Sequence, residues 1–297
     1  MMDYTSTQGL LFLTYLTNYS ISAMMRIIER NPPMDKLVGS HVIQYTQKEV
    51  DKALASAEEA VARMTYLGIT PLPYHDPHYP ILLHEIGDKP LLLYYKGAPP
   101  RWEKLAAVVG SRKISPSGEQ KTKAITSVLC KLGFGIVSGL ALGVDTIAHE
   151  QALAFNAYTI AVLPHPLDTI YPKQNYDLAN RILDAGGTLI CELPFGINRG
   201  KKSFVARNRI QSGISSLVVP TELRVESGTM HTVRFAYQAK RPVCLPIYED
   251  DSKVDNGLRY ILSKRGSSPQ VFTISHPDQL EEKLNKVDGK NPQIKLF

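Results

Sequence analysis

From Leu105 onward, short apolar segments alternate with amphipathic segments of helical length. The apolar runs predict strands at residues 105–110, 134–138, 158–163, 188–191, 216–220 and 242–247. The segments between them predict helices near residues 117–132, 143–155, 174–185, 205–213 and 229–239. Strands that alternate with helices of this length form βαβ units, which build a parallel sheet with helices on both faces. We therefore predict an α/β protein with an extended Rossmann-like parallel sheet.

The segment that precedes this sheet reads first as a small helical module and then as a connecting layer. Three stretches have apolar residues at helical spacing: "QGLLFLTYL", "SISAMMRIIER" and "KEVDKALASAEEAVARMTYLG". Residues 69–100 are rich in proline and tyrosine, and the apolar run Leu91–Tyr95 is bracketed by prolines, which predicts an edge strand. The expected organisation is a helical module at residues 1–60, a Rossmann-like domain at 61–280 and a tail at 281–297 that forms a last helix or frays.

Composition narrows the class of protein. The chain has 297 residues and 43% hydrophobic content, enough to bury a sizeable core. Its net charge of +6 matters only where the cations cluster. Cys130, Cys191 and Cys244 are far apart in apolar contexts, which predicts reduced core residues in a cytoplasmic protein. The apolar stretch Gly9–Met25 is interrupted by polar residues and no basic segment precedes it, so we expect neither a signal peptide nor a membrane span.

The stretch "AAVVGSRKISPSG" at residues 106–118 is the first candidate site. In an open α/β sheet, ligands bind beyond the carboxyl ends of the strands, where loop N–H groups and a helix N-terminus favour an anion. Gly110 permits a close backbone approach, the Ser111 hydroxyl can bond a phosphate oxygen, and Arg112 offers a planar set of donors. The three residues alone are a weak motif and also fit a turn glycine followed by a solvated arginine.

Three other motifs argue against cofactors and metals. "SGLALGVD" lacks the G-x-G-x-x-G fingerprint, which disfavours NAD and FAD. "GINRGKKS" imitates a Walker A loop, but three residues separate its glycines where that motif has four. Asp145 and His149 are spaced for one helix face, yet no third ligand and no nucleophile elbow accompany them. We therefore expect helix capping by Asp145, polar packing by His149, no cofactor and no bound metal.

The stretch "GINRGKKSFVARNRI" at residues 196–210 is the second candidate site. It contains no acidic residue, and Phe204 stands in the middle of its cations. Single-stranded nucleic acid sites combine cations that follow the backbone with rings that stack on bases. The alternative is a solvated basic loop in which Phe204 is buried.

Several blocks in order resemble the DNA processing protein family DprA, also called Smf. They are "VVGSR", "GFGIVSGLALGVDTIAHEQAL", "TIAVLPHPLDTIYPKQNYDL", "GGTLICELPFG", "FVARNRIQSGIS" and "ESGTMHTVRFAYQAKRPVCLP", and the likeness covers roughly residues 65–265. The resemblance implies an extended Rossmann domain, preceded here by a helical module, that binds single-stranded DNA without catalysis. It further implies a homodimer that loads the RecA recombinase onto that DNA in natural transformation.

The resemblance also implies roles for particular residues. The family's phosphate-gripping motif falls on Gly110, Ser111 and Arg112, and its DNA-contacting lysine and base-stacking aromatic fall on Lys201 and Phe204. Lys202 belongs to the same basic run, and the RNR element of the family falls on Arg207, Asn208 and Arg209.

Some positions depart from the family pattern. Pro164 and Pro166 replace glycines, Ile247 follows Pro246 where the family has "PG", and the "GxN" element reads Gly257-Leu258-Arg259. We expect the proline and isoleucine positions on the pocket side of the sheet, and no room for the winged-helix domain that many members add at the C-terminus.

A second function stays open, namely a nucleotide sensor or a nucleoside-monophosphate-cleaving enzyme of the related Rossmann-like group. The corresponding loop, "VESGTMHTV", lacks the glycine pair and has no glutamate after Thr229, which disfavours catalysis.

Overall fold

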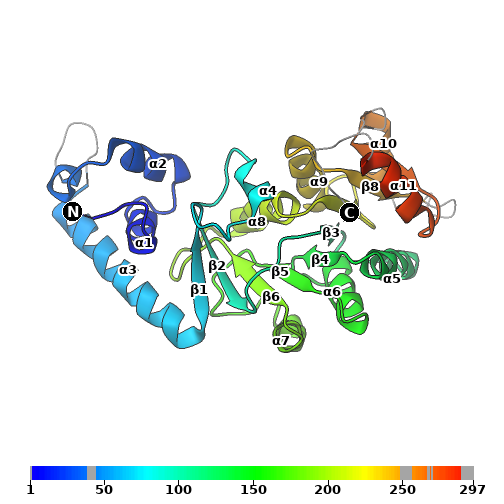
Figure 1. The fold of residues 1–297 in the computed structure, drawn as a ribbon, viewed down its shortest axis with the longest axis horizontal. Helices are drawn as coiled ribbons and strands as arrows, with labels where there is room; N and C mark the ends of the chain where they lie inside the picture. Colours follow the sequence, from blue (N-terminus) through cyan, green and yellow to red (C-terminus); the bar gives the residue numbers. More distant parts are fainter. Residues whose placement is uncertain (1, 39–44, 248–255, 266–267, 269, 289–297) are drawn as a thin grey trace.

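The computed structural model describes residues 2–38, 45–247, 256–265, 268 and 270–288. The described residues form a nine-stranded sheet with the order β1-β2-β6-β5-β4-β3-β7-β8-β9 (Figure 1). The strands are β1 (Ile69–Pro73), β2 (Leu92–Gly97), β3 (Leu105–Val109), β4 (Gly135–Ser138), β5 (Thr159–Val162), β6 (Thr188–Cys191), β7 (Leu217–Pro220), β8 (Val243–Pro246) and β9 (Val271–Ile274). Neighbouring strands from β3 to β9 are parallel, whereas β1 and β2 pair antiparallel at the β6 side. The predicted Rossmann-like α/β fold is confirmed, with an antiparallel extension.

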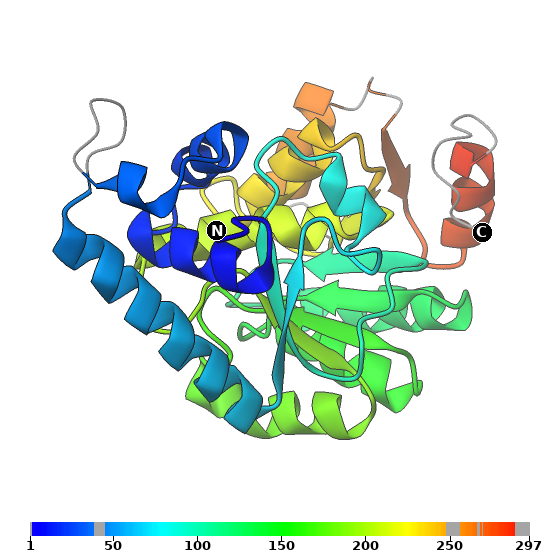
Figure 2. The same ribbon diagram turned by 60° about the vertical axis from the view of Figure 1, so that its left-hand side comes forward.

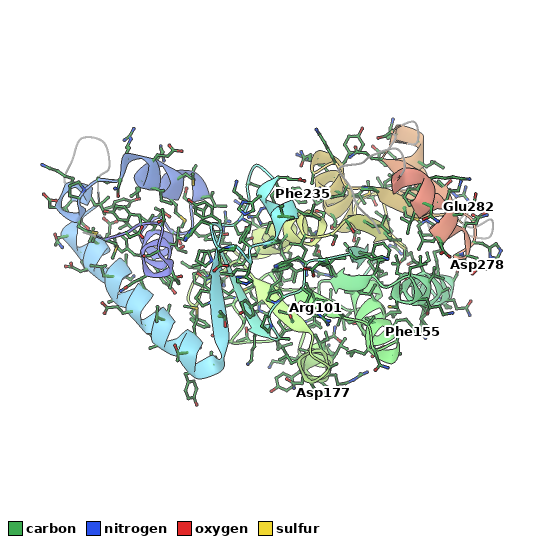
Figure 3. All side chains as sticks on the ribbon, viewed as in Figure 1. Arg101, Phe155, Asp177, Phe235, Asp278 and Glu282 are labelled. Carbon is green, nitrogen blue, oxygen red and sulfur yellow. The ribbon has the colours of Figure 1, made fainter. Side chains whose placement is uncertain are left out.

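Helices cover both faces of the sheet (Figure 1). One face carries α5 (Pro116–Lys131), α6 (Val144–Ala154) and α7 (Tyr176–Asp184). The other carries α4 (Ile81–His84), α8 (Lys201–Gly213), α9 (Thr229–Gln238) and α10 (Asn256–Arg265). Side chains fill the space between each helical layer and the strands (Figure 3). The helix α11 (Gln279–Asp288) follows β9, and its Leu280 and Leu284 join the same buried cluster as Ile125 and Leu129 of α5.

Local sequence explains where the best-defined helices begin and end. The helix α3 (Gln47–Leu67) opens with a capping box between Thr46 and Glu49 and ends at Gly68, whose φ of 65° is the left-handed conformation that glycine adopts without strain. The helix α5 opens because the Ser115 hydroxyl accepts a hydrogen bond from the Gly118 N–H at 3.0 Å.

The predicted strands and helices from Leu105 onward coincide with β3–β8 and α5–α9, apart from small differences at their ends. The largest difference concerns α8, which begins at Lys201 and not near residue 205. Gly200, with φ 57°, allows the turn into this helix without a side-chain cap. The first part of the second candidate site is therefore helical.

The prediction of an edge strand at Leu91–Tyr95 is wrong in its placement. The strand exists as β2, but it lies inside the sheet with β1 on one side and β6 on the other. Pro90 precedes the strand and removes no ladder hydrogen bond. The edge strand on this side of the sheet is β1, which carries Pro71 and Pro73.

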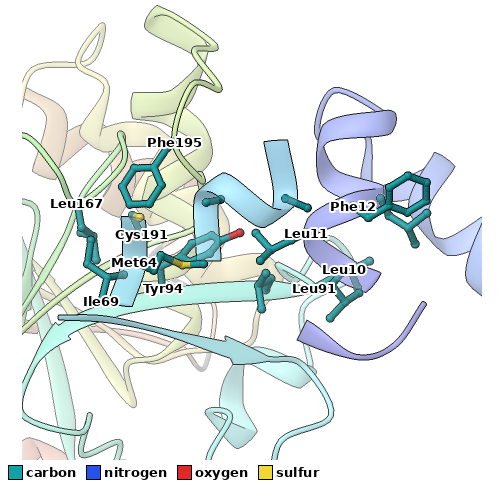
Figure 4. Close-up of a cluster of buried hydrophobic side chains, with 14 of the residues drawn as sticks. Leu10, Leu11, Phe12, Met64, Ile69, Leu91, Tyr94, Leu167, Cys191 and Phe195 are labelled. Atoms are coloured by element: carbon teal, nitrogen blue, oxygen red, sulfur yellow. The ribbon is translucent and has the colours of Figure 1, made fainter. Parts of the chain in front are cut away.

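The N-terminal helices pack beside the β1 edge of the sheet (Figure 2). They are α1 (Thr7–Leu16), α2 (Ile21–Arg30), the 3₁₀ turn η1 (Met34–Leu37) and α3. Figure 4 shows the buried side chains that join them to the sheet, with Leu11 of α1 and Met64 of α3 close to Tyr94 of β2. The predicted boundaries at residues 60 and 280 fall inside α3 and α11, so both helices run across them.

Candidate nucleic-acid interface

A cleft of about 430 Å³ opens at the carboxyl ends of β3 and β7, and we call it the β3 cleft. It is lined by the loop 109–113, by Ala141 and Asp145, by one side of α8, and by residues between Arg224 and Thr232. Both candidate stretches contribute to it, because its lining includes Gly110, Ser111 and Arg112 of the first and Phe204, Arg207 and Asn208 of the second. The cleft therefore lies at the sheet edge where an open α/β fold binds ligands.

Close packing explains the glycine after β3. A Cβ on Gly110 would lie 2.4 Å from Cγ2 of Val144 and 2.7 Å from the carbonyl oxygen of Glu222. The Ser111 N–H donates to that same carbonyl at 2.8 Å, and the Ser111 hydroxyl donates to the Lys113 carbonyl at 2.7 Å. The loop is thus held firmly against α6, and it presents an exposed Arg112 to the cleft.

Phe204 is half-buried and belongs to none of the three buried hydrophobic clusters of the described residues. The guanidinium carbon of Arg112 lies 5.2 Å from its ring centroid. The ring of Tyr171 meets it edge to face at a centroid distance of 6.1 Å. An aromatic with a cation beside it at the mouth of a cleft, rather than in the core, is the arrangement used to stack bases.

The floor of the β3 cleft is a buried pair, Arg207 and Asp145. The guanidinium of Arg207 donates to the Val162 carbonyl, and its Nε donates to Asn208 Oδ1 at 3.2 Å. Burial raises the pKa of the Asp145 carboxyl, although the charge of Arg207 acts in the opposite direction. Burial also lowers the pKa of Arg207 to about 10, so the guanidinium stays charged at neutral pH. Arg207 therefore adds a fixed positive charge beneath the cleft.

Arg209 lies on the other side of α8, away from the β3 cleft. Its Nη1 and Nη2 donate to the two carboxylate oxygens of Glu192 at 2.8 and 2.6 Å. The hydroxyl of Tyr19, from the N-terminal helices, also donates to Glu192. A carboxylate oxygen of Asp88 also lies 3.0 Å from Arg209 Nε. With 5% of its side chain exposed, Arg209 is engaged within the fold.

Lys201 and Lys202 are exposed on the first turn of α8 and do not line the β3 cleft. Lys201 precedes Phe204 by three residues, so the two side chains lie on neighbouring positions of the same helix face. Both lysines stand beside the opening rather than within it.

The sequence reasoning missed six polar residues that line the cleft: Lys113, Gln211, Arg224, Ser227, Thr229 and Thr232. Gln211 Nε2 and Ser227 Oγ are buried with no hydrogen-bond partner among the described residues. Both residues stand inside blocks that resemble the family, but they are uncharged and nothing local marks them as site residues. Gln211 lies on α8 and Ser227 in the loop before α9. Only the extra cations Lys113 and Arg224, next to the loops already singled out, left a usable signal in the sequence.

The other predicted positions have structural roles. The Nδ1 atom of His149 lies 2.8 Å from Thr159 Oγ1, and burial lowers the pKa of this imidazole to about 3, which confirms polar packing. Asp145 accepts from the Ala141 N–H at 3.3 Å and so holds the loop before α6, while Gly143 is the N-cap of that helix without a side-chain bond. The predicted helix-capping role is thus replaced by a loop contact.

The cysteines occupy interior positions, as predicted. Cys191 and Cys244 are buried and Cys130 is half-buried, and all three thiols are free. Burial raises the pKa of the Cys130 thiol to about 11. Among the described residues, no cluster of His, Cys, Asp and Glu has the composition of a metal site. No helix in the described part of the chain has the length and apolar character needed to cross a membrane.

The three departures from the family pattern do not line the β3 cleft. Pro164 is buried and Pro166 half-buried in the loop after β5. Ile247 packs against the buried cluster that α8, α9 and α10 share with the sheet. Gly257 packs on Leu223, where a Cβ would lie 2.5 Å from the carbonyl oxygen.

Fold and site together define a doubly wound Rossmann-like protein with a cationic, aromatic-lined cleft at the carboxyl edge of its sheet. The family model described as DNA recombination-mediator protein A matches residues 70–268. The chain belongs to this family, which confirms the resemblance to DprA and Smf seen in the sequence.

Individual relatives agree with this assignment. Protein Smf from Synechocystis is 38% identical over 220 residues, which cover 70% of this chain and 55% of that protein. The X-ray structure of DNA processing protein A from Streptococcus pneumoniae superposes with a TM-score of 0.76 at 26% identity, covering 94% of this chain and 98% of that one. DNA processing protein A from Helicobacter pylori, solved for its single-stranded DNA binding mode, gives a TM-score of 0.64 at 29% identity and covers 75% of this chain and 98% of that one. The matches span about half to two thirds of the first curated relatives' own length.

Proposed function

We propose that this protein binds single-stranded DNA in the β3 cleft. The observation that carries the proposal is the pairing of Arg112 with Phe204, in which a guanidinium able to bind a phosphate lies 5.2 Å from the centroid of a half-buried ring. The family membership and the single-stranded DNA binding mode of the Helicobacter pylori relative support the same ligand. Because phosphate contacts and stacking do not depend on base identity, we expect little sequence preference.

Charge favours a polyanion in this cleft. Its lining includes four cations, Arg112, Lys113, Arg207 and Arg224, against one acid, Asp145, which is already beside Arg207. We assign phosphate contacts to the exposed Arg112, Lys113 and Arg224, and to Lys201 and Lys202 beside the opening. The buried Arg207 and Asn208 shape the floor, and we assign no phosphate to Arg209. Gly110 and Ser111 hold the loop in place.

We further propose that the chain acts as a homodimer that loads RecA onto the bound strand. This part rests on the family resemblance, because no described surface is recognisable by itself as recombinase-binding. A pull-down with the cognate recombinase, with and without DNA, tests it. Absence of association in both conditions, with DNA binding intact, would remove the loading role.

A nucleotide-binding or nucleoside-monophosphate-cleaving function is the second candidate. The observation in its favour is Asp145, a carboxyl with a raised pKa in a cleft that has cations around it. Its carboxylate already accepts from the Ala141 N–H and lies close to Arg207, so it serves the loop rather than a substrate. We therefore propose DNA binding without catalysis.

A titration of fluorescent single-stranded DNA, duplex DNA and mononucleotides at two salt concentrations separates these functions. We expect tight binding of single strands and weak binding of mononucleotides. Arg112→Ala should weaken binding to all sequences alike and reduce the salt slope by roughly 0.7, the value for one lost phosphate contact on a single strand. Preferential binding of mononucleotides would favour the second candidate.

Substitutions of Phe204 give the sharpest test of base stacking in the β3 cleft. Phe204→Ala should reduce affinity for single-stranded DNA by about 1–3 kcal/mol, whereas Phe204→Trp should retain it, because any aromatic face can stack on a base. Because the ring is half-buried and outside the core, the melting temperature should barely change.

Phe155→Ala is the matched control for that test, since Phe155 is 38% exposed and has Lys131 5.9 Å from its ring centroid (Figure 3). Phe155 does not line the cleft and lies at the opposite end of α6 from the lining residue Asp145. A large fall in melting temperature with normal DNA binding in Phe204→Ala would contradict the stacking role.

A further inference from the structure

Tyr171 is an exposed aromatic next to the β3 cleft. It lies in the loop between β5 and the 3₁₀ turn η2 (Lys173–Asn175), so it is at the same carboxyl edge of the sheet as the cleft. Its residue exposure is 54%, although its ring meets Phe204 edge to face at 6.1 Å with an interplanar angle of 77°. Like Phe204, it belongs to none of the three buried clusters of the described residues.

Its surroundings suit the backbone of a nucleic acid. Lys173 is exposed two residues further along the chain. The nearest acid before Tyr171 in the loop, Asp168, is bound by Arg63 at 2.6 Å, so its charge is compensated. Arg112, Phe204 and Tyr171 are thus neighbours in space, and the exposed Lys173 follows Tyr171 two residues along the loop. This interleaving of charge and rings is what non-specific single-strand sites use.

We propose that Tyr171 is a second base-stacking position, and that the strand leaves the β3 cleft over the loop between β5 and α7. One base stacks at Phe204, another stacks on Tyr171, and the phosphate that follows lies near Lys173. This inference rests on the proposed single-strand binding and adds the direction in which the strand runs. It makes the aromatic site at least two nucleotides long.

Substitutions at position 171 test the proposal by affinity. Tyr171→Ala should weaken binding of an oligothymidylate by about 5- to 150-fold, which is the affinity equivalent of one lost stacking contact, and Tyr171→Trp should bind like the wild type. Tyr176→Ala is the matched control, because Tyr176 is 56% exposed and lies on the first turn of α7. It should bind within about two-fold of the wild type, and melting temperatures should be equal for all variants.

Fluorescence of 2-aminopurine placed at successive positions of the oligonucleotide identifies which ring each base contacts. In the wild type two positions should be quenched; Tyr171→Ala should restore fluorescence at one of them, and Phe204→Ala at the other. If Tyr171→Ala binds like the wild type, or restores the same position as Phe204→Ala, Tyr171 only supports Phe204 and the proposal is wrong. If Phe204→Ala and Arg112→Ala also bind normally, the proposed function itself is wrong.

Discussion

Replacing Arg209 with methionine leaves the Glu192 carboxylate buried without its cation. Both side chains are 5% exposed, and the two guanidinium hydrogen bonds to Glu192 are lost together. Removing one partner of a buried ion pair costs about 3–5 kcal/mol, because the remaining charge is desolvated and unpaired. That is a large part of the stability of an ordinary domain, about 5–15 kcal/mol, so the loss is readily measured by urea denaturation.

Arg241→Met provides the matched control. Arg241 is as buried as Arg209, with 4% of its side chain exposed, and it also binds a carboxylate, that of Glu85, at 2.8 Å. Glu85 is 57% exposed, so water can solvate it after the substitution. The truncation is the same, but we expect a cost of only about 1–2 kcal/mol from the lost hydrogen bond to Leu82 and the surface pair. The difference between the two variants isolates the unpaired Glu192.

The pH dependence of the stability loss in Arg209→Met tests whether the unpaired Glu192 carboxylate causes it. Burial alone would raise the pKa of the Glu192 carboxyl, but the charge and hydrogen bonds of Arg209, with the bond from Tyr19, hold it below its ordinary value. In the wild type this group therefore contributes stability above its unfolded pKa, and the contribution is lost only as the pH falls through the lower folded pKa. In Arg209→Met burial dominates, so the folded pKa is raised and the variant recovers stability as the pH falls towards the unfolded value of about 4.3. Equal losses for the two arginine variants, or a deficit for Arg209→Met that is the same near pH 7.5 and pH 5, would refute the reasoning.

Two further substitutions test the floor of the cleft and the packing beneath it. Gly139→Ala would place a Cβ 1.8 Å from Nη1 of Arg207, so we expect a lower melting temperature and weaker DNA binding. Gly87→Ala is the control and should change neither property, because a Cβ at Gly87 meets open space. A normal melting temperature and normal DNA binding in Gly139→Ala would show that Arg207 can move freely. The pKa of about 3 at His149 is below its unfolded value, so this group contributes stability above about pH 6.5 that is lost at about 1.4 kcal/mol per pH unit as the pH falls. His149→Gln should reduce this dependence of the unfolding free energy on pH, measured by urea denaturation at several acidic pH values. An unchanged dependence would contradict the buried, neutral state of His149.

The part of the fold that the sequence predicts is the part with uniformly apolar strands. Each strand from β3 to β8 is buried along its whole length, so it reads as an apolar run between polar turns. β1 escaped notice because it contains two prolines, which an edge strand tolerates. The order of the strands, and the antiparallel pair at the β6 side, depend on contacts distant in sequence that no local pattern records.

The site was predictable where its residues share a loop or a helix turn. Gly110, Arg112 and Phe204 could be singled out from two stretches, and the structure brings them to one cleft. Gln211 and Ser227 could not be, because neutral polar side chains become informative only when burial leaves them without partners. Arg209 illustrates the opposite difficulty, since its partner Glu192 lies in another element and nothing local distinguishes a paired cation from a free one.

Helix geometry explains why the two arginines of the RNR element, Arg207 and Arg209, have different surroundings. Residues two apart on an α-helix point about 200° apart, so one helix cannot turn both Arg207 and Arg209 into the same cleft. Arg209 instead ties α8 to Tyr19 and Glu192, and α8 carries Phe204 at its other end. Arg209→Met should therefore weaken DNA binding by loosening α8, with an unchanged salt slope, because no phosphate contact is removed. The family resemblance implies that Arg209 contacts DNA directly, and this role requires the salt slope to fall by roughly 0.7 in Arg209→Met. DNA titrations of Arg209→Met and Arg112→Ala at several salt concentrations therefore decide whether Arg209 positions α8 or binds a phosphate.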